Sequence, residues 1–319
     1  MRRQKSIALP ILLISLLSVF FALLLFWNIG RGLFQNKSSD TMQATLQRIE
    51  LIIPGSGFVA RTEHLVVSPD EGKAIRLQEA GELLRPQSEI IELKKGSRGS
   101  ETILNQHNGL LSYIKDGCEE KFILANLDQL LLQEIIDPPA KQIRLGDDQT
   151  VKKGDFLFKI VENDQMHLIL ALDPIYTELT EGLFSQNFKA SSEINFRIES
   201  PTNLILGATV HKIEKREKEH SLVVLTTPYY IDTLLNNRKI SGFFTFGYVT
   251  ASLLPKSAVH KGENGKYYVY EKNEEARQIE VKLRGLDPFS QQYIVEGLET
   301  SQEIYTDAGQ WIKKTPVKP

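Results

Sequence analysis

The sequence contains 319 residues, a length that corresponds to two or three domains. Its 38 lysine and arginine residues and 40 aspartate and glutamate residues leave a net charge of −2, so it lacks the basic excess of a nucleic-acid-binding protein. A hydrophobic content of 41% is typical of a globular chain and argues against a disordered or collagen-like one. The single cysteine, Cys118, excludes an intrachain disulfide and an all-cysteine metal site.

The segment from Ile7 to Ile29 contains 23 residues and no charge. As an α-helix it would extend about 35 Å, which exceeds the roughly 30 Å of a bilayer's hydrocarbon core. A cleaved signal peptide is the alternative, but the apolar run is longer than such a peptide usually has, and no small-x-small cleavage site follows it. The sequence therefore predicts an uncleaved transmembrane anchor over 7–29.

Basic residues on the two sides of this segment predict its orientation. Three of them precede it, together with the α-amino group, whereas Arg31 and Lys37 follow it. The positive-inside rule therefore favours a cytoplasmic tail at 1–6. We expect a single-pass protein of the inner (cell) membrane with about 290 residues outside the cytoplasm, of which 30–50 form a linker and a first membrane-proximal strand.

Beyond the linker, the chain has the pattern of a mainly β protein. Short β-favouring runs alternate with glycine, proline and polar turn residues, which favours sandwiches or barrels over an α/β sheet. The charged run 212–220 alternates in sign and predicts a solvated hairpin tip. The predicted strands are 51–53, 57–60, 65–67, 156–161, 167–172, 193–198, 208–213, 222–226, 243–250, 266–270, 277–283 and 293–295.

Two stretches have a helical pattern. In 119–136, apolar residues recur at three- and four-residue spacings up to Pro138-Pro139, which predicts an amphipathic helix. Its apolar face either packs on the core or binds a partner, and 231–236 is expected to form a single turn. The candidate partner-binding residues of the longer helix are Ile123, Leu127, Leu130 and Leu131.

The sequence contains no recognisable catalytic or cofactor motif. A glycine-rich dinucleotide loop, a P-loop and a G-x-S-x-G elbow are all absent. The six histidines are scattered, and the pair His211 and His220 has no carboxylate or cysteine at metal-ligand spacing. We therefore expect no catalytic, cofactor-binding or metal-binding residues and no enzymatic activity. An envelope hydrolase is the alternative within the enzyme class.

Two segments share a form in which glycine-containing turns separate short strands. The first is 66–93, and the second comprises 104–117 and 145–166. Glycine adopts positive φ at little cost, which the tight turns of a small flattened barrel require. The predicted turn positions of these segments are Pro69, Gly72, Gly81, Gly109 and Gly154.

These segments resemble the split lipoyl-like domain, or barrel-sandwich hybrid, of bacterial membrane fusion proteins, the HlyD-like periplasmic adaptor subunits. The matching motifs are Val67-Ser68-Pro69 with its following glycines, Val151-Lys152-Lys153-Gly154-Asp155, and Leu254-Pro255-Lys256-Ser257-Ala258-Val259. Val295-x-Gly297-Leu298 completes the series, so that Pro255 and Gly297 are two further turn positions.

The resemblance implies three β domains after the anchor. The expected domains are a split lipoyl-like domain at 51–168 with the helix 119–136 inserted, a β-barrel domain at 169–253, and a membrane-proximal domain with a C-terminal tail at 254–319. The family often inserts a long coiled-coil hairpin between the two lipoyl halves. Here only 94–102 separates them, which is too short for a coiled coil.

The resemblance also implies a function. We expect a non-catalytic adaptor of a bacterial export or efflux system that docks an inner-membrane transporter permease, ATP-driven or other, and that forms homo-oligomers. No nucleic acid is expected as a partner, and the missing hairpin argues against contact with an outer-membrane duct. The alternative is an envelope scaffold that reuses the adaptor fold, linked to cell division or wall assembly.

Overall fold

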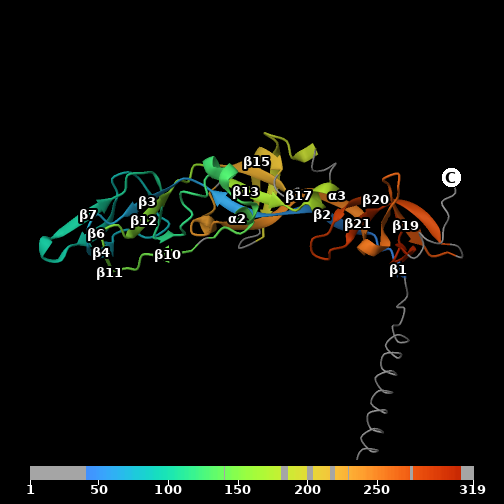
Figure 1. The fold of residues 1–319 in the computed structure, drawn as a ribbon, viewed down its shortest axis with the longest axis horizontal. Helices are drawn as coiled ribbons and strands as arrows, with labels where there is room; N and C mark the ends of the chain where they lie inside the picture. The colour runs from blue at the N-terminus through green and yellow to red at the C-terminus, as the bar shows by residue number, and fades with distance from the viewer. Residues whose placement is uncertain are drawn as a thin grey trace, which may run out of the picture.

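The computed structural model describes residues 41–139, 141–180, 186–199, 204–215, 220–228, 230–273 and 276–309. The predicted tail, anchor and most of the linker lie outside these residues, as do part of the charged run 212–220 and the end of the C-terminal tail. Within the described parts of the chain, no helix has the length and hydropathy needed to cross a membrane. Three β bodies follow one another along the long axis of the molecule (Figure 1).

The first body is a sandwich of two four-stranded sheets with the strand orders β3-β12-β8-β5 and β11-β4-β6-β7. Strand β12, from the second half of the repeated pattern, pairs with β3, from the first half, so the two halves form one core. The strands are β3 (Glu63–Val67), β4 (Gly72–Arg76), β5 (Leu83–Leu84), β6 (Glu89–Lys94), β7 (Ser100–Leu104), β8 (Gly109–Ser112), β11 (Gln149–Val151) and β12 (Phe156–Val161).

The segment where related proteins would carry a coiled-coil hairpin is a tight turn. Strands β6 and β7 pair directly, with Lys94 opposite Ser100, and the 3-10 turn η1 (Gly96–Arg98) connects them. Gly96 and Gly99 have φ angles of +64° and +87°, which a side chain would disfavour. The prediction that 94–102 holds no long helical hairpin is confirmed.

The second body is a closed six-stranded barrel. Its strands follow the order β17-β14-β15-β16-β13-β2, and β2 pairs with β17 to close the ring. Side chains such as Leu168, Leu170, Phe196, Val223 and Phe244 fill its interior. The strands are β2 (Gln47–Ala60), β13 (Met166–Leu172), β14 (Glu193–Ile198), β15 (Ile205–Lys215), β16 (Ser221–Thr227) and β17 (Lys239–Leu254).

Strand β2 corrects the predicted start of the sandwich. The strands predicted at 51–53 and 57–60 are one continuous strand, which belongs to the barrel. Pro54 does not interrupt β2 because the ladder between β2 and β13 ends at Ser56. Pro54 therefore has no β13 residue opposite it, and its missing N–H breaks no hydrogen bond to that strand. Since β13 is also a barrel strand, the sandwich spans 63–161 rather than 51–168.

The insertion at 119–136 is not the continuous helix that its pattern predicts. It contains a 3-10 segment, η2 (Leu124–Gln129), and one short α-helix, α2 (Leu132–Ile136), separated by the extended residues Leu130 and Leu131. Its apolar side chains pack on the outer face of the barrel against residues such as Phe58 and Ile169. Packing along this curved barrel face therefore outweighs the helical preference of residues 119–136.

The third body is a small β domain that receives strand β17 from the barrel. The strand order is β1-β22-β19-β20-β21-β17, and β18 (His260–Lys261) pairs with β19. The other strands are β1 (Thr41–Gln43), β19 (Tyr267–Glu271), β20 (Arg277–Leu286), β21 (Tyr293–Glu296) and β22 (Glu303–Tyr305). Helix α3 (Pro174–Leu179) contacts β20, and η4 (Asp232–Leu234) precedes β17. The chain that leads from the predicted anchor therefore enters this domain through β1.

A glycine in β2 provides a test of the barrel packing. A Cβ atom built on Gly57 would lie 1.8 Å from the carbonyl oxygen of Ile169 in β13. We expect Gly57→Ala to cost about 3 kcal/mol of unfolding free energy by overpacking. Urea unfolding of the full chain measures this loss. Gly207→Ala in β15, where a Cβ meets no atom within 4 Å, is the control; equal stability of the two variants would contradict the packing.

Candidate functional site

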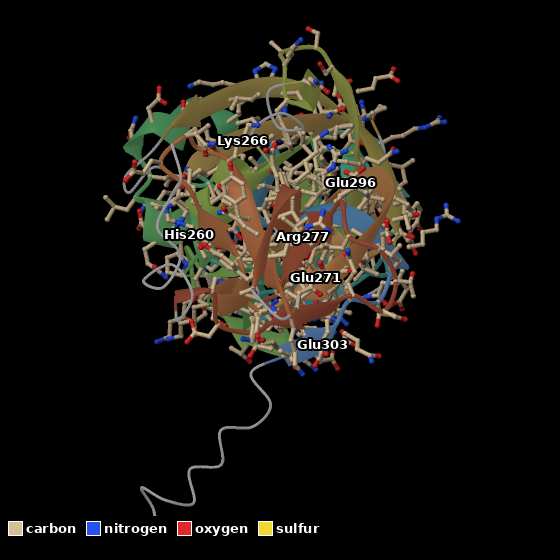
Figure 2. The ribbon with its side chains drawn as sticks, turned by 90° about the vertical axis from the view of Figure 1, so that its right-hand side faces the viewer. His260, Lys266, Glu271, Arg277, Glu296 and Glu303 are labelled. Carbon is tan, nitrogen blue, oxygen red and sulfur yellow. The ribbon has the colours of Figure 1, made fainter. Side chains whose placement is uncertain are left out.

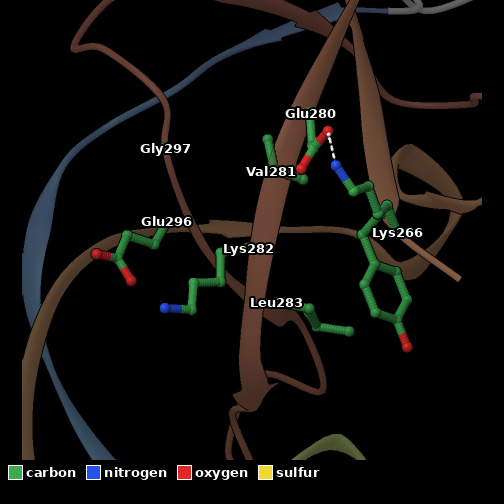
Figure 3. A pocket seen from close by; sticks show the side chains of 8 residues that line it. Lys266, Glu280, Val281, Lys282, Leu283, Glu296 and Gly297 are labelled. Carbon is green, nitrogen blue, oxygen red and sulfur yellow. Dashed lines mark hydrogen bonds and ion pairs between the residues drawn. The ribbon is translucent and has the colours of Figure 1, made fainter.

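The third body, the predicted membrane-proximal domain, lies at the opposite end of the molecule from the sandwich (Figure 1). It carries an open groove. The groove has a volume of about 650 Å³ and runs along β19, β20 and the end of β21. Figure 3 shows Lys266, Lys282 and Glu296 around it, with Val281 and Leu283 on the central strand. The groove therefore combines apolar and charged side chains of both signs, as a protein-binding surface does.

Two ion pairs lie at this groove. Lys266 Nζ lies 2.8 Å from Glu280, and Arg284 pairs with Glu296. The hydrogen bond from Lys266 to Glu280 raises the pKa of that lysine, and the one from Arg284 lowers the pKa of Glu296. Such exposed pairs add little stability, but they fix the positions of charges that a partner can meet.

The end face around the groove continues this mixed pattern (Figure 2). Lys272 pairs with Glu303 at 2.8 Å, and Glu303 also accepts a 2.6 Å hydrogen bond from the hydroxyl of Thr41 in β1. These two hydrogen bonds, from Lys272 first and then Thr41, lower the pKa of Glu303. The first described strand is thus fastened to the face that surrounds the groove.

A second polar site lies inside the molecule, where the sandwich meets the barrel. Six ionisable side chains, three cations and three carboxylates, form one cluster, and each of these side chains is at most 5% exposed. We call it the junction cluster; its members are Arg61, Glu63, Asp116, Glu119, Lys159 and Arg238.

Glu63 at the start of β3 is the centre of the junction cluster. Its carboxylate lies 2.6 Å from Arg61, 2.9 Å from Lys159 and 3.0 Å from Arg238. Arg61 also donates to the carbonyl oxygens of Leu234 and Leu235, beside the barrel. One sandwich carboxylate is therefore bound by cations from three different parts of the chain.

The other two carboxylates of the cluster are Asp116, just before the insertion, and Glu119, its first residue. Asp116 accepts a 2.9 Å hydrogen bond from Arg238, which also donates to the carbonyl oxygen of Val59 in β2. Glu119 lies 3.2 Å from Lys159 and accepts a hydrogen bond from the backbone N–H of Asp116. The sandwich, the barrel and the insertion thus meet in one hydrogen-bonded network.

The pKa values of the two central carboxylates follow from this network. Burial alone would raise the pKa of Glu63, but Arg61, Arg238 and Lys159 outweigh burial and lower it. Burial opposes ionisation of Asp116 in the same way, and the hydrogen bond and charge of Arg238 lower its pKa. Both groups are therefore ionised and paired at neutral pH.

Three carboxylates of the cluster, on Glu63, Asp116 and Glu119, have oxygen atoms within 4.8 Å of one another. That spacing alone would suit a metal ion. Each of them, however, already contacts a lysine or arginine of the cluster. A cation placed among them would have to displace or oppose these side chains, so the donor set fits ion pairs rather than a metal.

The candidate partner-binding residues of the insertion fall into two groups. Leu127 and Leu130 are 3% and 4% exposed and pack on the barrel. Ile123 is half-buried, and Leu131 is 62% exposed. The structure therefore does not bring the four together on one exposed face.

The predicted turn positions lie at the ends of strands. Gly81, Gly109, Gly154 and Gly297 have positive φ, whereas Gly72, the first residue of β4, does not. A Cβ on Gly72 would lie 2.8 Å from the carbonyl oxygen of Lys94, so the close approach of two strands explains the glycine there. Pro69 lies in the turn between β3 and β4, and Pro255 precedes the 3-10 turn η5 (Lys256–Ala258).

Sequence reasoning missed the junction cluster, because its members are scattered from Arg61 to Arg238. One local signal was available. Lys159 stands in the otherwise apolar strand Phe156–Val161, all of whose residues are buried. A lysine at such a position needs a buried carboxylate partner, but the sequence does not say which one.

Residues 63–162 match the family model for the RND-related barrel-sandwich hybrid domain, which covers a little under a third of the chain. These residues therefore form such a domain, and the resemblance seen in the turn pattern is confirmed there. No curated protein sequence matches the chain closely enough to count as a relative.

Three solved structures have distant similarity to the whole chain. ZneB from Cupriavidus metallidurans is 8% identical with a TM-score of 0.33, covering 84% of this chain and 92% of its own. MacA from Actinobacillus actinomycetemcomitans is 11% identical with a TM-score of 0.32, covering 84% and 98%. A putative efflux transporter from Bacteroides eggerthii is 12% identical with a TM-score of 0.30, covering 87% and 96%.

Removal of the Arg238 guanidinium tests the junction cluster. Arg238→Met leaves Glu63 and Asp116 facing an apolar side chain, and breaking a buried ion pair in this way costs about 3–5 kcal/mol. Urea unfolding followed by intrinsic fluorescence measures the loss. The neighbouring Lys239→Ala, which breaks the exposed pair with Asp137, should cost under about 1 kcal/mol; comparable losses would contradict the assignment.

The lowered pKa values predict an acid dependence of stability. A carboxylate with a lowered pKa stabilises the folded state above its unfolded pKa, and this contribution is lost as pH falls through the folded pKa. The ordinary values for Glu63 and Asp116 are 4.5 and 3.8, so their contribution should begin to fall below about pH 4.5. Unfolding free energies measured between pH 7 and 3 should show a shallower slope for Asp116→Asn, but not for Glu120→Gln.

Proposed function

We propose that the chain is a non-catalytic, membrane-anchored adaptor of a bacterial export or efflux system that docks an inner-membrane permease through its extracytoplasmic β domains. The observation that carries the proposal is the RND-related barrel-sandwich hybrid domain, joined in one chain to a closed barrel and a further β domain. These modules supply surfaces and mechanical connections. Within the described residues, the buried charges of the junction cluster are accounted for by their ion pairs with one another, which supports a structural role for them over a catalytic one.

The position of the chain's entry supports docking through the membrane-proximal domain. Strand β1 begins at Thr41 and pairs with β22 in that domain. The predicted anchor ends at Ile29, so the linker has 11 residues and reaches at most about 40 Å when fully extended. The face in Figure 2 would then lie close to the bilayer, where the extracytoplasmic surface of a permease is accessible.

The chemistry of the groove supports a protein partner over a lipid surface. The two lysines that line the groove, Lys266 and Lys282, are matched in number by Glu280 and Glu296, so the lining carries no net positive charge to attract anionic headgroups. A protein partner can instead offer complementary charges at fixed positions and an apolar contact to the half-buried Leu283. We therefore place the permease-binding surface at this groove.

The short hairpin at 94–102 motivates the alternative, an envelope scaffold linked to cell division or wall assembly. The turn between β6 and β7 ends the sandwich only a few residues beyond its sheets, so no long arm extends toward an outer-membrane duct. A chain without that arm can act locally at the inner membrane. Localisation at the septum together with a division phenotype would favour the scaffold over the adaptor.

Site-specific crosslinking in living cells tests the docking surface. A photoreactive phenylalanine analogue in place of Tyr267, which lines the groove, should yield an adduct with a polytopic membrane protein of the permease class. The same analogue at Arg98, on the distal turn of the sandwich, should not. Mass spectrometry of the adducts identifies the partner. Adducts from Tyr267 that contain only division or wall-synthesis proteins would contradict the adaptor and support the scaffold.

A charge reversal provides a matched control for the crosslink. Lys282→Glu places a second carboxylate next to Glu296 in the groove and should reduce the adduct several-fold. Lys153→Glu makes the same chemical change at the exposed turn before β12, far from the groove, and should leave the adduct unchanged. Equal loss in both variants would indicate a general electrostatic effect and not docking at the groove.

A further inference from the structure

We infer that residues 116–142, which include the insertion 119–136, form a clamp that locks the sandwich to the barrel, so that these two β bodies move as a single rigid unit. We call this segment the strap. The inference goes beyond the adaptor role, because it concerns the mechanics of the chain itself and holds whatever partner the groove binds. It rests on where the strap begins, where it packs and which charged groups it carries.

The strap leaves the sandwich and returns to it at one point. Strands β9 (Ile114–Lys115) and β10 (Ile143–Arg144) form a two-residue antiparallel ladder, with Lys115 opposite Ile143. The strap is therefore a loop whose two ends are held together by that ladder. The sandwich sheets therefore do not need the strap to complete their own strand pairing.

The apolar side of the strap covers the barrel and not the sandwich. Phe122, Leu127 and Ile135 pack with barrel residues that point outward from β2, β13 and β16. The rings of Phe58 and Phe122 meet edge to face, 4.9 Å apart. Barrel strands β13 and β16 are consequently buried on both faces along most of their length. The strap is thus connected in sequence to the sandwich, but its apolar side chains pack on the barrel.

The polar side of the strap closes the junction cluster. Asp116 binds Arg238, which precedes the first residue of barrel strand β17, and Glu119 binds Lys159 of sandwich strand β12. Without these two carboxylates, three buried cations would face Glu63 alone. Because a buried charge must keep its partner, a hinge motion at this junction would break several buried ion pairs together.

Further contacts at the rim of the strap bind it to the barrel side, and a neighbouring bond connects that side directly to the sandwich. Asp137 lies 2.6 Å from Lys239 of β17, and Gln142 donates a 2.7 Å hydrogen bond to the carbonyl oxygen of Asn236. The side chain of Asn236 in turn accepts a 2.6 Å hydrogen bond from Ser112 in sandwich strand β8. These contacts lie on the side of the junction where β17 begins, so the strap holds the angle between the bodies at more than one point.

Distances between spin labels test the clamp in the full chain purified in detergent. One nitroxide replaces Lys153 on the sandwich, and the other replaces Glu193 on barrel strand β14; both positions are exposed. Cys118 is 2% exposed and stays unlabelled. We expect a narrow distance distribution by pulsed electron resonance. A broad distribution in the unaltered chain would overturn the inference.

Two variants ask whether the strap causes the rigidity. Asp116→Asn with Glu119→Gln keeps the shape of the strap but removes its two cluster charges, and should at least double the width of the distribution. Replacement of 116–142 by Asn-Gly, a two-residue turn between the paired Lys115 and Ile143, should broaden it further. An unchanged width in the folded double variant would also overturn the inference, even if the replacement variant does not fold.

Two controls separate loosening of the junction from unfolding. A second label pair, at Glu193 and Tyr248, lies within the strands of the barrel and should stay narrow in every variant. Glu120→Gln with Glu134→Gln neutralises two strap carboxylates outside the cluster, of which Glu134 pairs with Lys121 of the strap itself, and should leave the Lys153–Glu193 width unchanged. If the distance distribution broadened in this control, the loss of any strap carboxylate would loosen the junction, which would contradict a specific role for Asp116 and Glu119.

Discussion

The pairing of β2 with β17 is the constraint on which the rest of the structure depends. The ladder runs from Phe58 opposite Lys239 to Gln47 opposite Ala251, so two segments far apart in the sequence form one ribbon. The end of the ladder at Phe58 and Lys239 closes the barrel. Beyond the other end, β17 pairs with β21 of the third body. The same ladder places Arg61 just after β2 and Arg238 just before β17. Both arginines of the junction cluster therefore reach Glu63 because the barrel closes there.

The two junctions along the chain differ in the forces that hold them. The junction of barrel and sandwich adds the ion pairs and hydrogen bonds of the junction cluster to an apolar contact of Leu110 and Val161 with Leu235. Ion pairs and hydrogen bonds are directional and restrict how the two bodies can be arranged. At the junction of the barrel and the third body, an apolar cluster of Ile49, Leu51, Ala251 and Ile294 accompanies the strand pairing of β17 with β21. Apolar contact is not directional, so small shifts between surfaces cost less there than at a buried ion pair.

Much of the fold follows from local sequence signals. The alternation of short β runs with turns predicts a mainly β chain, and glycines such as Gly154, with a φ of +89°, mark its tight turns. The nine residues at 94–102 exclude a coiled coil by length alone. These features depend only on neighbours in the chain, and the sequence therefore predicts them correctly.

The remaining features depend on contacts that the sequence does not display. The helical pattern at 119–136 is real, but the barrel face that Leu127 and Leu130 contact breaks it at two extended residues. Pro54 suggests a strand end, yet β2 passes through it because its neighbour β13 has already ended. The junction cluster was invisible for the same reason, since Lys159 shows only that a partner must exist.

The balance of charge in the junction cluster explains why ions are found at a place where apolar side chains would pack as well. Burying ions rarely adds stability over a well-packed apolar contact, because the cost of desolvation offsets the attraction. The three cations and three carboxylates instead require that each buried charge keeps a partner of opposite sign. A displacement of Asp116 relative to Arg238 would leave a charge unpaired. An apolar contact would tolerate such a displacement. The cluster therefore contributes chiefly geometry: it sets the angle at which the sandwich leaves the barrel, and with it the distance between the distal turn and the groove at the other end.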